Sequence, residues 1–335
     1  MLRAAIVGIG TWGRNLVDAA QDSEIIKFVA GATRTPAKAE GFCKQHAIRL
    51  LPDYAAVLAE PAIDAVVLAT PHSMHCEQIV AAAKAGKHVF VEKPLGVTAK
   101  SAEQAAMACA QNRLTLAVGY NWRFQPALQE AKCMLEDGRL GRLLHLEGNF
   151  CGPSAYRFAR EHWRQDRDEA PAGGMTGRGV HVVDAMLYLA ASPISSVSAQ
   201  SDRLVHDYGA DDTTSMLFRF QSGATGYLGT VIATAETWRL QVFGSKGWIE
   251  VGAVAHLHTW DMKVALLDPQ DLFKKDAPQV KRFPKTSTER AELDHFAARA
   301  MARRPIALPG GDEVHNVAVL EAIVRSASKG EKVRL

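Results

Sequence analysis

The stretch LRAAIVGIGTWG, residues 2–13, joins a short apolar run to three glycines spaced as Gly-x-Gly-x-x-Gly. The apolar run is typical of a buried parallel strand, and residues 14–20 after the glycines have the pattern of a helix. In such a strand–loop–helix unit the glycines permit a tight turn, a close approach of the backbone to a pyrophosphate, and close helix–strand packing. The stretch therefore predicts a dinucleotide-binding loop rather than an ordinary glycine-rich turn, with contacts from Gly8, Gly10, Thr11, Trp12 and Gly13.

The end of the second predicted strand, residues 25–32, bears on the choice between NAD and NADP. In this fingerprint an acidic side chain about 20 residues after the last glycine binds the adenosine ribose of NAD. That position is Thr33, followed by Arg34, and the run 31–35 contains no carboxylate. Because an arginine can pair with a 2′-phosphate, the sequence favours NADP over NAD. The alternative is that Arg34 is solvated and that the site accepts both cofactors.

Strand and helix patterns alternate up to about residue 120, with further apolar runs at 63–69, 88–91 and 114–118. This alternation predicts a doubly wound parallel sheet and assigns residues 1–122 to a Rossmann domain. Open α/β sheets bind ligands at the carboxyl ends of their strands. We therefore add to the cofactor-binding residues those that follow two of these strands, Thr70, Pro71, His72, His75 and Asn121. For the two histidines, a place in a loop or helix cap is an equal alternative.

The run HVFVEKP, residues 88–94, ends another predicted strand with a charged pair and a proline. Pro94 keeps Lys93 out of the α conformation and cannot donate to a sheet ladder, so the strand stops here. Lys93 is then either an ordinary surface charge at the carboxyl end of the strand or a proton donor directed at a substrate. Glu92, Lys93 and Pro94 are predicted to contact the cofactor.

The alternation of strands and helices is lost after residue 122. Strand-like runs separated by β-turn residues occupy 143–150, 194–204, 213–220, 224–233, 238–251 and 255–267. Helical patterns cover 126–136, 178–190, 288–302 and 312–329. The pattern predicts a second α/β domain, residues 123–335, with a large, mostly antiparallel open sheet.

Composition narrows the class of protein. A chain of 335 residues is long enough for two domains, and its net charge of +3 gives no reason to expect a nucleic-acid partner. Five dispersed cysteines without a Cys-x-x-Cys pair predict neither a disulfide framework nor a metal site. The sequence shows no signal peptide and no apolar run near the ~20 residues that cross a bilayer, so we expect a cytoplasmic protein without a membrane partner.

Three motifs together resemble the Gfo/Idh/MocA family of oxidoreductases: the glycine loop at 8–13, Glu-Lys-Pro at 92–94, and GGMTGRGVHVVD at 173–184. The resemblance extends over essentially the whole chain. It implies a Rossmann domain followed by an α/β domain with a mostly antiparallel sheet. It also implies NAD(P)-dependent oxidation or reduction at a carbinol or carbonyl carbon of a small-molecule substrate, such as a sugar, a cyclitol or an acidic derivative. The resemblance further implies a homodimer or homotetramer formed through the second sheet.

The resemblance assigns roles to two residues. Lys93 matches the family's acid/base lysine, and His181 matches the histidine that contacts the reacting oxygen. Asp184, one turn further along, is predicted to have a structural or interface role rather than a catalytic one. The sequence departs from the family pattern at Gly177, where many sugar and cyclitol dehydrogenases carry an aspartate four residues before the histidine. Lys93 therefore becomes the main candidate for moving the proton.

Three arginines and three aromatic residues are further candidates for contacts to the substrate: Arg123, Arg164, Arg178, Trp122, Tyr156 and Trp163. The arginines would clamp a substrate carboxylate, and the aromatic side chains would form an apolar wall beside Lys93 and His181. The alternative is that the arginines are solvated or pair with acids such as Glu161 and Asp166.

Two other functions stay open at the level of sequence. One is elimination or glycosidic cleavage by an enzyme that keeps its cofactor bound and oxidises the substrate only transiently. The other is a non-catalytic regulator that binds NAD(P). The presence of both Lys93 and His181 favours an enzyme, since a sensor needs neither residue.

Overall fold

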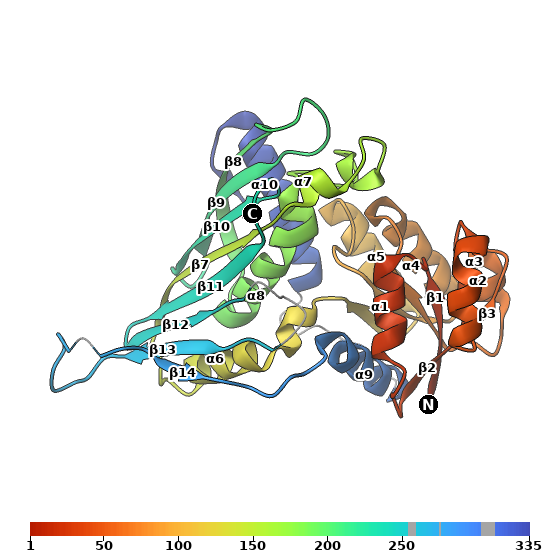
Figure 1. Cartoon of the computed structure of the whole chain (residues 1–335), viewed down its shortest axis with the longest axis horizontal. Helices are drawn as coiled ribbons and strands as arrows, with labels where there is room; N and C mark the ends of the chain where they lie inside the picture. The colour runs from red at the N-terminus through yellow and green to blue at the C-terminus, as the bar shows by residue number, and fades with distance from the viewer. Residues whose placement is uncertain (254–258, 275, 303–311) are drawn as a thin grey trace. The chain divides into compact units, whose positions relative to one another are not determined.

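The structure, a computed structural model, describes residues 1–253, 259–274, 276–302 and 312–335. The chain divides into two compact units (Figure 1). The first unit comprises Met1–Asn121 and Ser287–Val317, and the second comprises Trp122–Thr286 and Ala318–Leu335. Each unit is built on a sheet of its own.

The first unit contains a parallel sheet with the strand order β3-β2-β1-β4-β5-β6 (Figure 1). The strands are β1 (Leu2–Val7), β2 (Ile26–Ala32), β3 (Arg49–Leu50), β4 (Ala65–Leu68), β5 (His88–Val91) and β6 (Leu116–Val118). The order reverses between β1 and β4, and ligands bind at such a reversal in open α/β sheets. The predicted doubly wound sheet is confirmed, although the two-residue strand β3 was not predicted.

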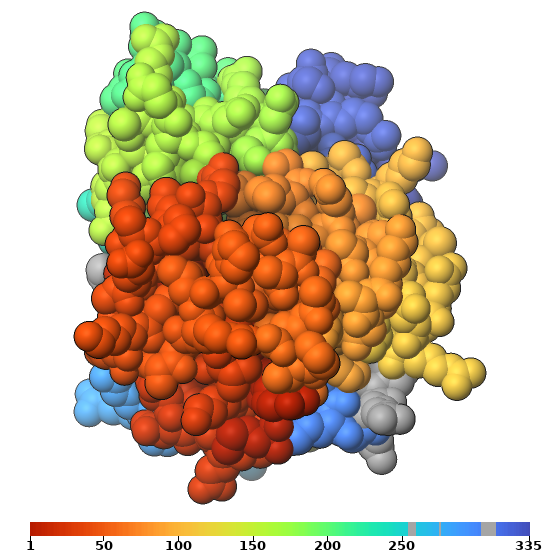
Figure 2. Space-filling model, turned by 90° about the vertical axis from the view of Figure 1, so that its right-hand side faces the viewer, coloured from red at the N-terminus to blue at the C-terminus, as the bar shows by residue number. Residues whose placement is uncertain are grey.

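Helices cover both faces of this sheet, and Figure 2 shows one side of the N-terminal part of the unit in red to orange. They are α1 (Thr11–Ala19), α2 (Pro36–Gln45), α3 (Tyr54–Ala59), α4 (His75–Lys84), α5 (Ala99–Gln111) and α9 (Thr288–Met301). One core lies under α1, α2 and α9, where Leu16, Cys43 and Phe296 are buried. Helices α4 and α5 pack on each other, and α4 packs on β4 and β5.

Helix α9 belongs to the first unit, although the division of the sequence at residue 122 assigns it to the second domain. It packs on β1, β2, β5 and α1. Leu293, Phe296, Ala297 and Ala300 lie on one stripe of the helix and are buried in the core of the first unit. An apolar stripe predicts that a helix is buried on one side, but it does not show which sheet the helix covers.

The second unit contains a nine-stranded sheet with the order β14-β13-β12-β11-β7-β10-β9-β8-β15. Its strands are β7 (Leu143–Cys151), β8 (Ile194–Asp202), β9 (Thr213–Phe220), β10 (Thr225–Val231), β11 (Thr237–Gly244), β12 (Gly247–Val251), β13 (Met262–Leu266), β14 (Gln279–Lys281) and β15 (Val333–Arg334). All neighbouring pairs are antiparallel except β7 and β10. The predicted mostly antiparallel sheet is confirmed. Of the strand predicted at 255–267, residues 255–258 lie outside the described residues.

Helix α8 (Val180–Ala190) packs on β7 and β10, and on α6 (Pro126–Glu136). Gly148 of β7 permits this close approach, because a Cβ there would lie 2.6 Å from Cγ1 of Val182. Helix α10 (Asp312–Lys329) is tied to β8, where Ser326 Oγ accepts a hydrogen bond from the Ala199 backbone N–H at 2.9 Å. The sheet's other face carries half-exposed side chains such as Leu217, and its predicted use in a homodimer or homotetramer stays a prediction.

Within the described residues, every helix is too short or too polar to cross a membrane.

Candidate active site

The glycine loop lies between the carboxyl end of β1 and the start of α1. Gly8 has a φ of +92°, in the left-handed region, and its N–H donates to the Ala32 carbonyl at 2.9 Å. A Cβ on Gly8 would lie 2.4 Å from the Ala69 carbonyl oxygen, and a Cβ on Gly13 would lie 2.0 Å from the Gly8 carbonyl oxygen. Both contacts are to backbone, so no neighbouring side chain can move aside, and both positions require glycine.

Gly10, between these two, has a different environment. It is the N-cap of α1, and a Cβ placed on it would meet no atom within 4 Å. The first backbone N–H groups of a helix have no partner inside the helix, and they attract anions. The first turn of α1 contains no acidic residue that would repel a phosphate. The loop therefore fits the pyrophosphate of a dinucleotide, which would approach over Gly10 and the N-terminus of α1.

Alanine at Gly13 is expected to weaken the fold, whereas alanine at Gly10 is expected to weaken cofactor binding. Gly13→Ala should lower the free energy of unfolding by about 1–3 kcal/mol, because the added carbon overlaps the Gly8 carbonyl. Gly10→Ala should change it by less than about 0.5 kcal/mol but weaken cofactor binding ~10-fold or more, since the methyl group occupies the approach to the backbone. Urea unfolding and cofactor titration measure the two effects. Equal loss of stability in both variants would contradict this account.

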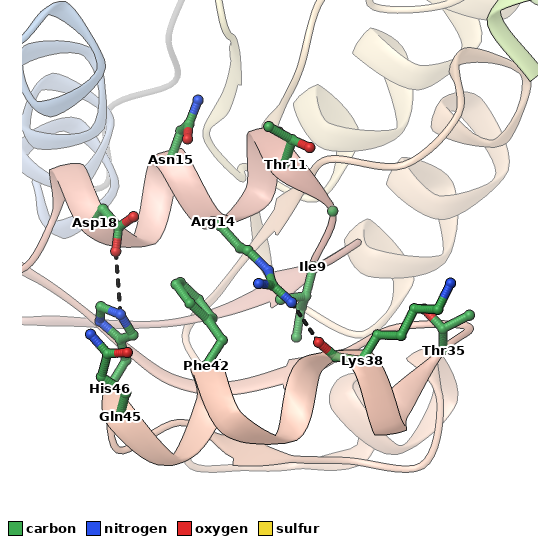
Figure 3. A pocket seen from close by; sticks show the side chains of 11 residues that line it. Ile9, Thr11, Arg14, Asn15, Asp18, Thr35, Lys38, Phe42, Gln45 and His46 are labelled. Carbon is green, nitrogen blue, oxygen red and sulfur yellow. Dashed lines mark hydrogen bonds and ion pairs between the residues drawn. The ribbon is translucent and has the colours of Figure 1, made fainter. Parts of the chain in front are cut away.

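A cavity of about 660 Å³ opens beside the glycine loop, between α1 and α2 (Figure 3). Arg14 of α1 donates from Nη2 to the Lys38 carbonyl at 2.5 Å, and its guanidinium lies 5.1 Å from the ring centroid of Phe42. Lys38 and Thr35 line the same cavity from α2 and the residue before it. Two cationic side chains thus lie beside the phosphate-binding end of α1.

The predicted residues Thr33 and Arg34 follow β2. Thr33 is half-buried and Arg34 is exposed, and neither lines the cavity that contains Lys38. Sequence reasoning missed Arg14 and Lys38. Lys38 lies in the first turn of α2, four residues after Arg34 in the sequence.

The loop after β4 contains further residues that were predicted to bind the cofactor, among them His72 and His75. His75 is fully buried, with Nδ1 at 2.8 Å from the Pro94 carbonyl and Nε2 at 3.1 Å from the Thr70 carbonyl. The ring thus links the loop after β4 to the loop after β5, which favours the loop alternative for His75 over direct contact with a cofactor. His72 is 7% exposed, and its ring centroid is 5.8 Å from that of His75. Pro71 is half-buried and caps the short helix that contains His72.

Lys93 is the second residue after β5, which lies between β4 and β6 in the sheet. The Lys93–Pro94 peptide bond is cis, and Lys93 is only partly buried. Glu92 is 7% exposed, and burial raises the pKa of its carboxyl group to about 7. The Lys93 ammonium and the Trp12 indole N–H oppose this rise in pKa, and the carboxyl of Glu289 adds to it.

Asn121 is buried and is held by the start of α9. Its Nδ2 donates to Glu289 Oε1 at 2.9 Å and to Thr288 Oγ1 at 3.2 Å. Sequence reasoning missed Thr288 and Glu289, because nothing in the sequence shows that a helix 168 residues further along meets Asn121. All of these residues belong to the first unit.

In the second unit, His181 lies on the first turn of α8 and is 5% exposed. Its ring stacks on the Trp122 indole, with centroids 5.4 Å apart and planes 20° apart. Trp122 is fully buried and also contacts Trp238 and Trp260 at centroid distances of 4.7 and 5.0 Å. Trp122 therefore supports His181 from behind and does not offer a surface to a substrate, which corrects its predicted place in an apolar wall.

The segment before α8 departs from the α-helix that the sequence predicts. Residues Met175–Gly179 form a π-helical turn, which is rare and often occurs at functional sites. Gly177 lies in this turn, and a Cβ on it would meet no atom within 4 Å. The position that lacks the family's aspartate is thus open space rather than a position filled by another side chain.

Two of the three candidate clamp arginines are bound to carboxylates of the protein. Arg123 donates to both oxygens of Asp184, at 2.8 and 2.6 Å, in a pair that is almost fully buried. Arg178 donates to Glu236 at 2.7 Å and lies 4.8 Å from the Phe150 ring centroid. These contacts favour the ion-pair alternative over the clamp, although the acids are Asp184 and Glu236 rather than the predicted Glu161 and Asp166.

The remaining substrate candidates lie in the segment between β7 and α8. Arg164 is exposed, and its guanidinium is 4.1 Å from the ring centroid of the partly buried Trp163. Tyr156 is 58% exposed. Among the described residues, no group of three or more His, Cys, Asp or Glu side chains is arranged to hold a metal ion.

A Rossmann sheet with a glycine loop of this geometry is typical of domains that bind a dinucleotide such as NAD(P). Residues 2–120 match the oxidoreductase family with an NAD-binding Rossmann fold, and residues 128–250 match the GFO/IDH/MocA C-terminal domain. The chain belongs to the Gfo/Idh/MocA family of oxidoreductases, as its motifs indicate.

Several named proteins are similar to this chain over most of their length. The chain is 28% identical to scyllo-inositol 2-dehydrogenase (NAD(+)) of Bacillus subtilis over 270 residues, 77% of this chain and 75% of the relative. It is 28% identical to D-xylose 1-dehydrogenase (NADP(+)) 2 of Haloferax volcanii over 334 residues, 98% of this chain and 97% of the relative. The crystal structure of aldose-aldose oxidoreductase from Caulobacter crescentus, complexed with glycerol, superposes with a TM-score of 0.88 at 27% identity, covering 100% of this chain and 99% of that chain.

Proposed function

We propose that the protein is an NADP-preferring dehydrogenase or reductase that acts on a carbinol or carbonyl carbon of a sugar or cyclitol. Lys93 exchanges the proton on the reacting oxygen, and His181 contacts the same oxygen. The observation that carries the proposal is the placement of Lys93. It is partly exposed at the carboxyl end of β5, in the same sheet whose β1 leads into the glycine loop. The bound nicotinamide would supply hydride transfer, and the chain's own residues would bind, orient and move the proton.

The proposed substrate is neutral rather than acidic. Arg123 and Arg178 already bind Asp184 and Glu236, so neither needs a substrate carboxylate to neutralise its charge. The relatives named above act on inositol, xylose and aldose according to their names, which supports a polyhydroxylated substrate. The open space at Gly177 leaves room for a substituent that an aspartate would exclude.

A panel of neutral sugars, cyclitols and their carboxylated analogues, offered with NADP⁺ and with NADPH, tests this function through the absorbance of the reduced nicotinamide. We expect turnover with neutral members and little with acidic ones. Conversion of substrate without net consumption of free cofactor would instead identify transient oxidation by a bound cofactor. Tight cofactor binding without turnover across the whole panel would identify a regulator.

The preference for NADP is proposed to depend on Arg34 together with Lys38. Removal of either charge, in Arg34→Ala or Lys38→Ala, should lower NADPH affinity ~10-fold or more while changing NADH affinity little. Lys44→Ala, in the last turn of the same helix, is the matched control and should leave the ratio of the two affinities unchanged. Fluorescence titration with both cofactors gives the ratio. An unchanged ratio in both test variants would remove these residues from the 2′-phosphate site.

A further inference from the structure

The residue before Lys93, Glu92, has a buried carboxyl group. Glu92 is the first residue after β5, and its side chain turns inward against Gly119, where a Cβ would lie 2.8 Å from Oε1 and 3.2 Å from Oε2. Only 7% of Glu92 is exposed, and Oε1 has no hydrogen-bond partner among the described residues. A buried carboxylate oxygen without a donor is costly, whereas a protonated carboxyl group avoids that cost.

The acid that faces Glu92 from α9 has the opposite environment. Glu289 accepts hydrogen bonds from Asn121 at 2.9 Å, Thr288 at 3.3 Å and Ser287 at 3.4 Å. It also lies in the first turn of a 14-residue helix, where the helix dipole favours a negative charge. The carboxyl of Glu289 thus has its own hydrogen-bond donors, and its charge makes ionisation of Glu92 harder.

Other groups around Glu92 complete the cluster. The Trp12 indole N–H favours the ionised carboxyl, yet Trp12 Nε1 makes no hydrogen bond of normal geometry among the described residues. Asn121 Oδ1 is likewise buried without a hydrogen-bond partner in that part of the chain. The charged groups that act on Glu92 are Lys93 beside it and Glu289 opposite, and Glu292 lies on the same buried face of α9. Glu92 thus lies between the positive charge of Lys93, which favours its ionised form, and the carboxyl of Glu289, which opposes it.

We propose that Glu92 is a proton-exchanging residue of the cofactor site. Its protonated fraction is largest when the cofactor is absent or reduced, and it releases its proton when the oxidised, cationic nicotinamide adds a positive charge to that of Lys93 at the end of β5. The inference rests on the proposed function only in that a nicotinamide cofactor binds at this edge of the sheet. A buried group responds strongly to a new charge because the surrounding dielectric constant is low.

The same exchange balances charge during turnover. Oxidation of an alcohol by NADP⁺ gives a carbonyl, NADPH and one proton, and it removes the positive charge of the nicotinamide ring. Lys93 accepts the proton from the hydroxyl group and passes it to solvent. The loss of the nicotinamide charge then makes Glu92 basic again, so Glu92 takes up a proton from solvent. Glu92 then releases its proton when the next oxidised cofactor replaces the reduced one, which leaves the overall proton balance unchanged.

Proton release on cofactor binding tests the proposal without any turnover. Calorimetric titration in buffers of different ionisation enthalpy gives the number of protons released by NADP⁺ and by NADPH. Both forms carry the same phosphates, so the difference between them reports the nicotinamide charge. At a pH near 7, where Glu92 is about half protonated, NADP⁺ should release about half a proton more per site than NADPH.

Variants assign the difference to Glu92. The difference in proton release between NADP⁺ and NADPH should vanish in Glu92→Gln. It should decrease in Glu289→Gln, which lowers the negative charge facing Glu92. Glu103→Gln, an exposed acid on α5 of the same unit, should leave it unchanged. Binding of both cofactor forms with no difference in the wild type, or an unchanged difference in Glu92→Gln, would overturn the inference. If Glu92→Gln fails to fold, Glu289→Gln decides: the same difference in proton release as in the wild type would overturn the inference. Absence of cofactor binding in the wild type would instead contradict the proposed function.

Discussion

With alanine in place of Lys93, kcat is expected to fall ~100-fold or more, because the proposed proton exchange at the reacting oxygen loses its side chain. Lys93→Arg should stay similarly impaired, since a guanidinium keeps the positive charge but does not release a proton near neutral pH. Steady-state kinetics with the best neutral substrate from the panel gives kcat. Fluorescence titration of the same variants separates a loss of cofactor affinity from a loss of chemistry.

Lys100→Ala is the matched control for this prediction. Lys100 lies in the first turn of α5 of the same unit, and it is exposed. Its replacement should leave kcat unchanged. If Lys93→Ala also kept the wild-type kcat, Lys93 would be an ordinary surface charge, and the proposed mechanism would be wrong.

The second large effect concerns stability. Asp184→Ala should lower the free energy of unfolding of the second unit by about 3–5 kcal/mol, because it leaves the buried guanidinium of Arg123 without its carboxylate. Urea unfolding followed by tryptophan fluorescence reports this change, since Trp122, Trp238 and Trp260 are buried in the same unit.

Two further variants show whether the loss comes from the uncompensated charge. The double replacement Arg123→Met with Asp184→Leu should recover much of the lost stability, because a buried ion pair is often no more stable than apolar residues of similar volume. Glu136→Gln, which breaks the pair between Lys132 and the exposed carboxyl of Glu136, should cost no more than about 0.5 kcal/mol. A loss in Asp184→Ala as small as in this control would show that the Arg123–Asp184 pair contributes little.

The elements that the sequence predicts well are those with a local physical cause. The strand, glycine loop and helix at residues 2–20 follow from apolar runs and turn residues next to one another. Lys93 is placed at a strand end because Pro94 stops the ladder. The strands β3, β14 and β15 have two or three residues each. Such short strands form only because a neighbouring strand offers hydrogen bonds, so the sequence alone does not predict them.

Contacts between distant parts of the chain account for what the sequence does not predict. Arg123 meets Asp184 and Arg178 meets Glu236 across 61 and 58 residues, whereas the sequence suggested acids much closer by. Those partners depend on how α8, β7 and β11 pack, which periodicity does not fix. Nothing in the amino-acid composition of Met175–Gly179 indicates a π-helical turn. The sequence therefore predicts an α-helix, in which Gly177 and His181 would share a face.

The position of α9 constrains how the chain acquires its structure during synthesis. The first 121 residues leave the ribosome long before Leu293 and Phe296, which fill the core beside β1 and β2. Until residue 301 has emerged, the nascent Rossmann sheet keeps part of an apolar face uncovered, and Asn121 lacks the carboxylate that accepts its hydrogen bond. Exposed apolar surface of this kind makes partly synthesised chains prone to aggregate. The first unit is therefore completed by a segment that is translated long after the last strand of its sheet.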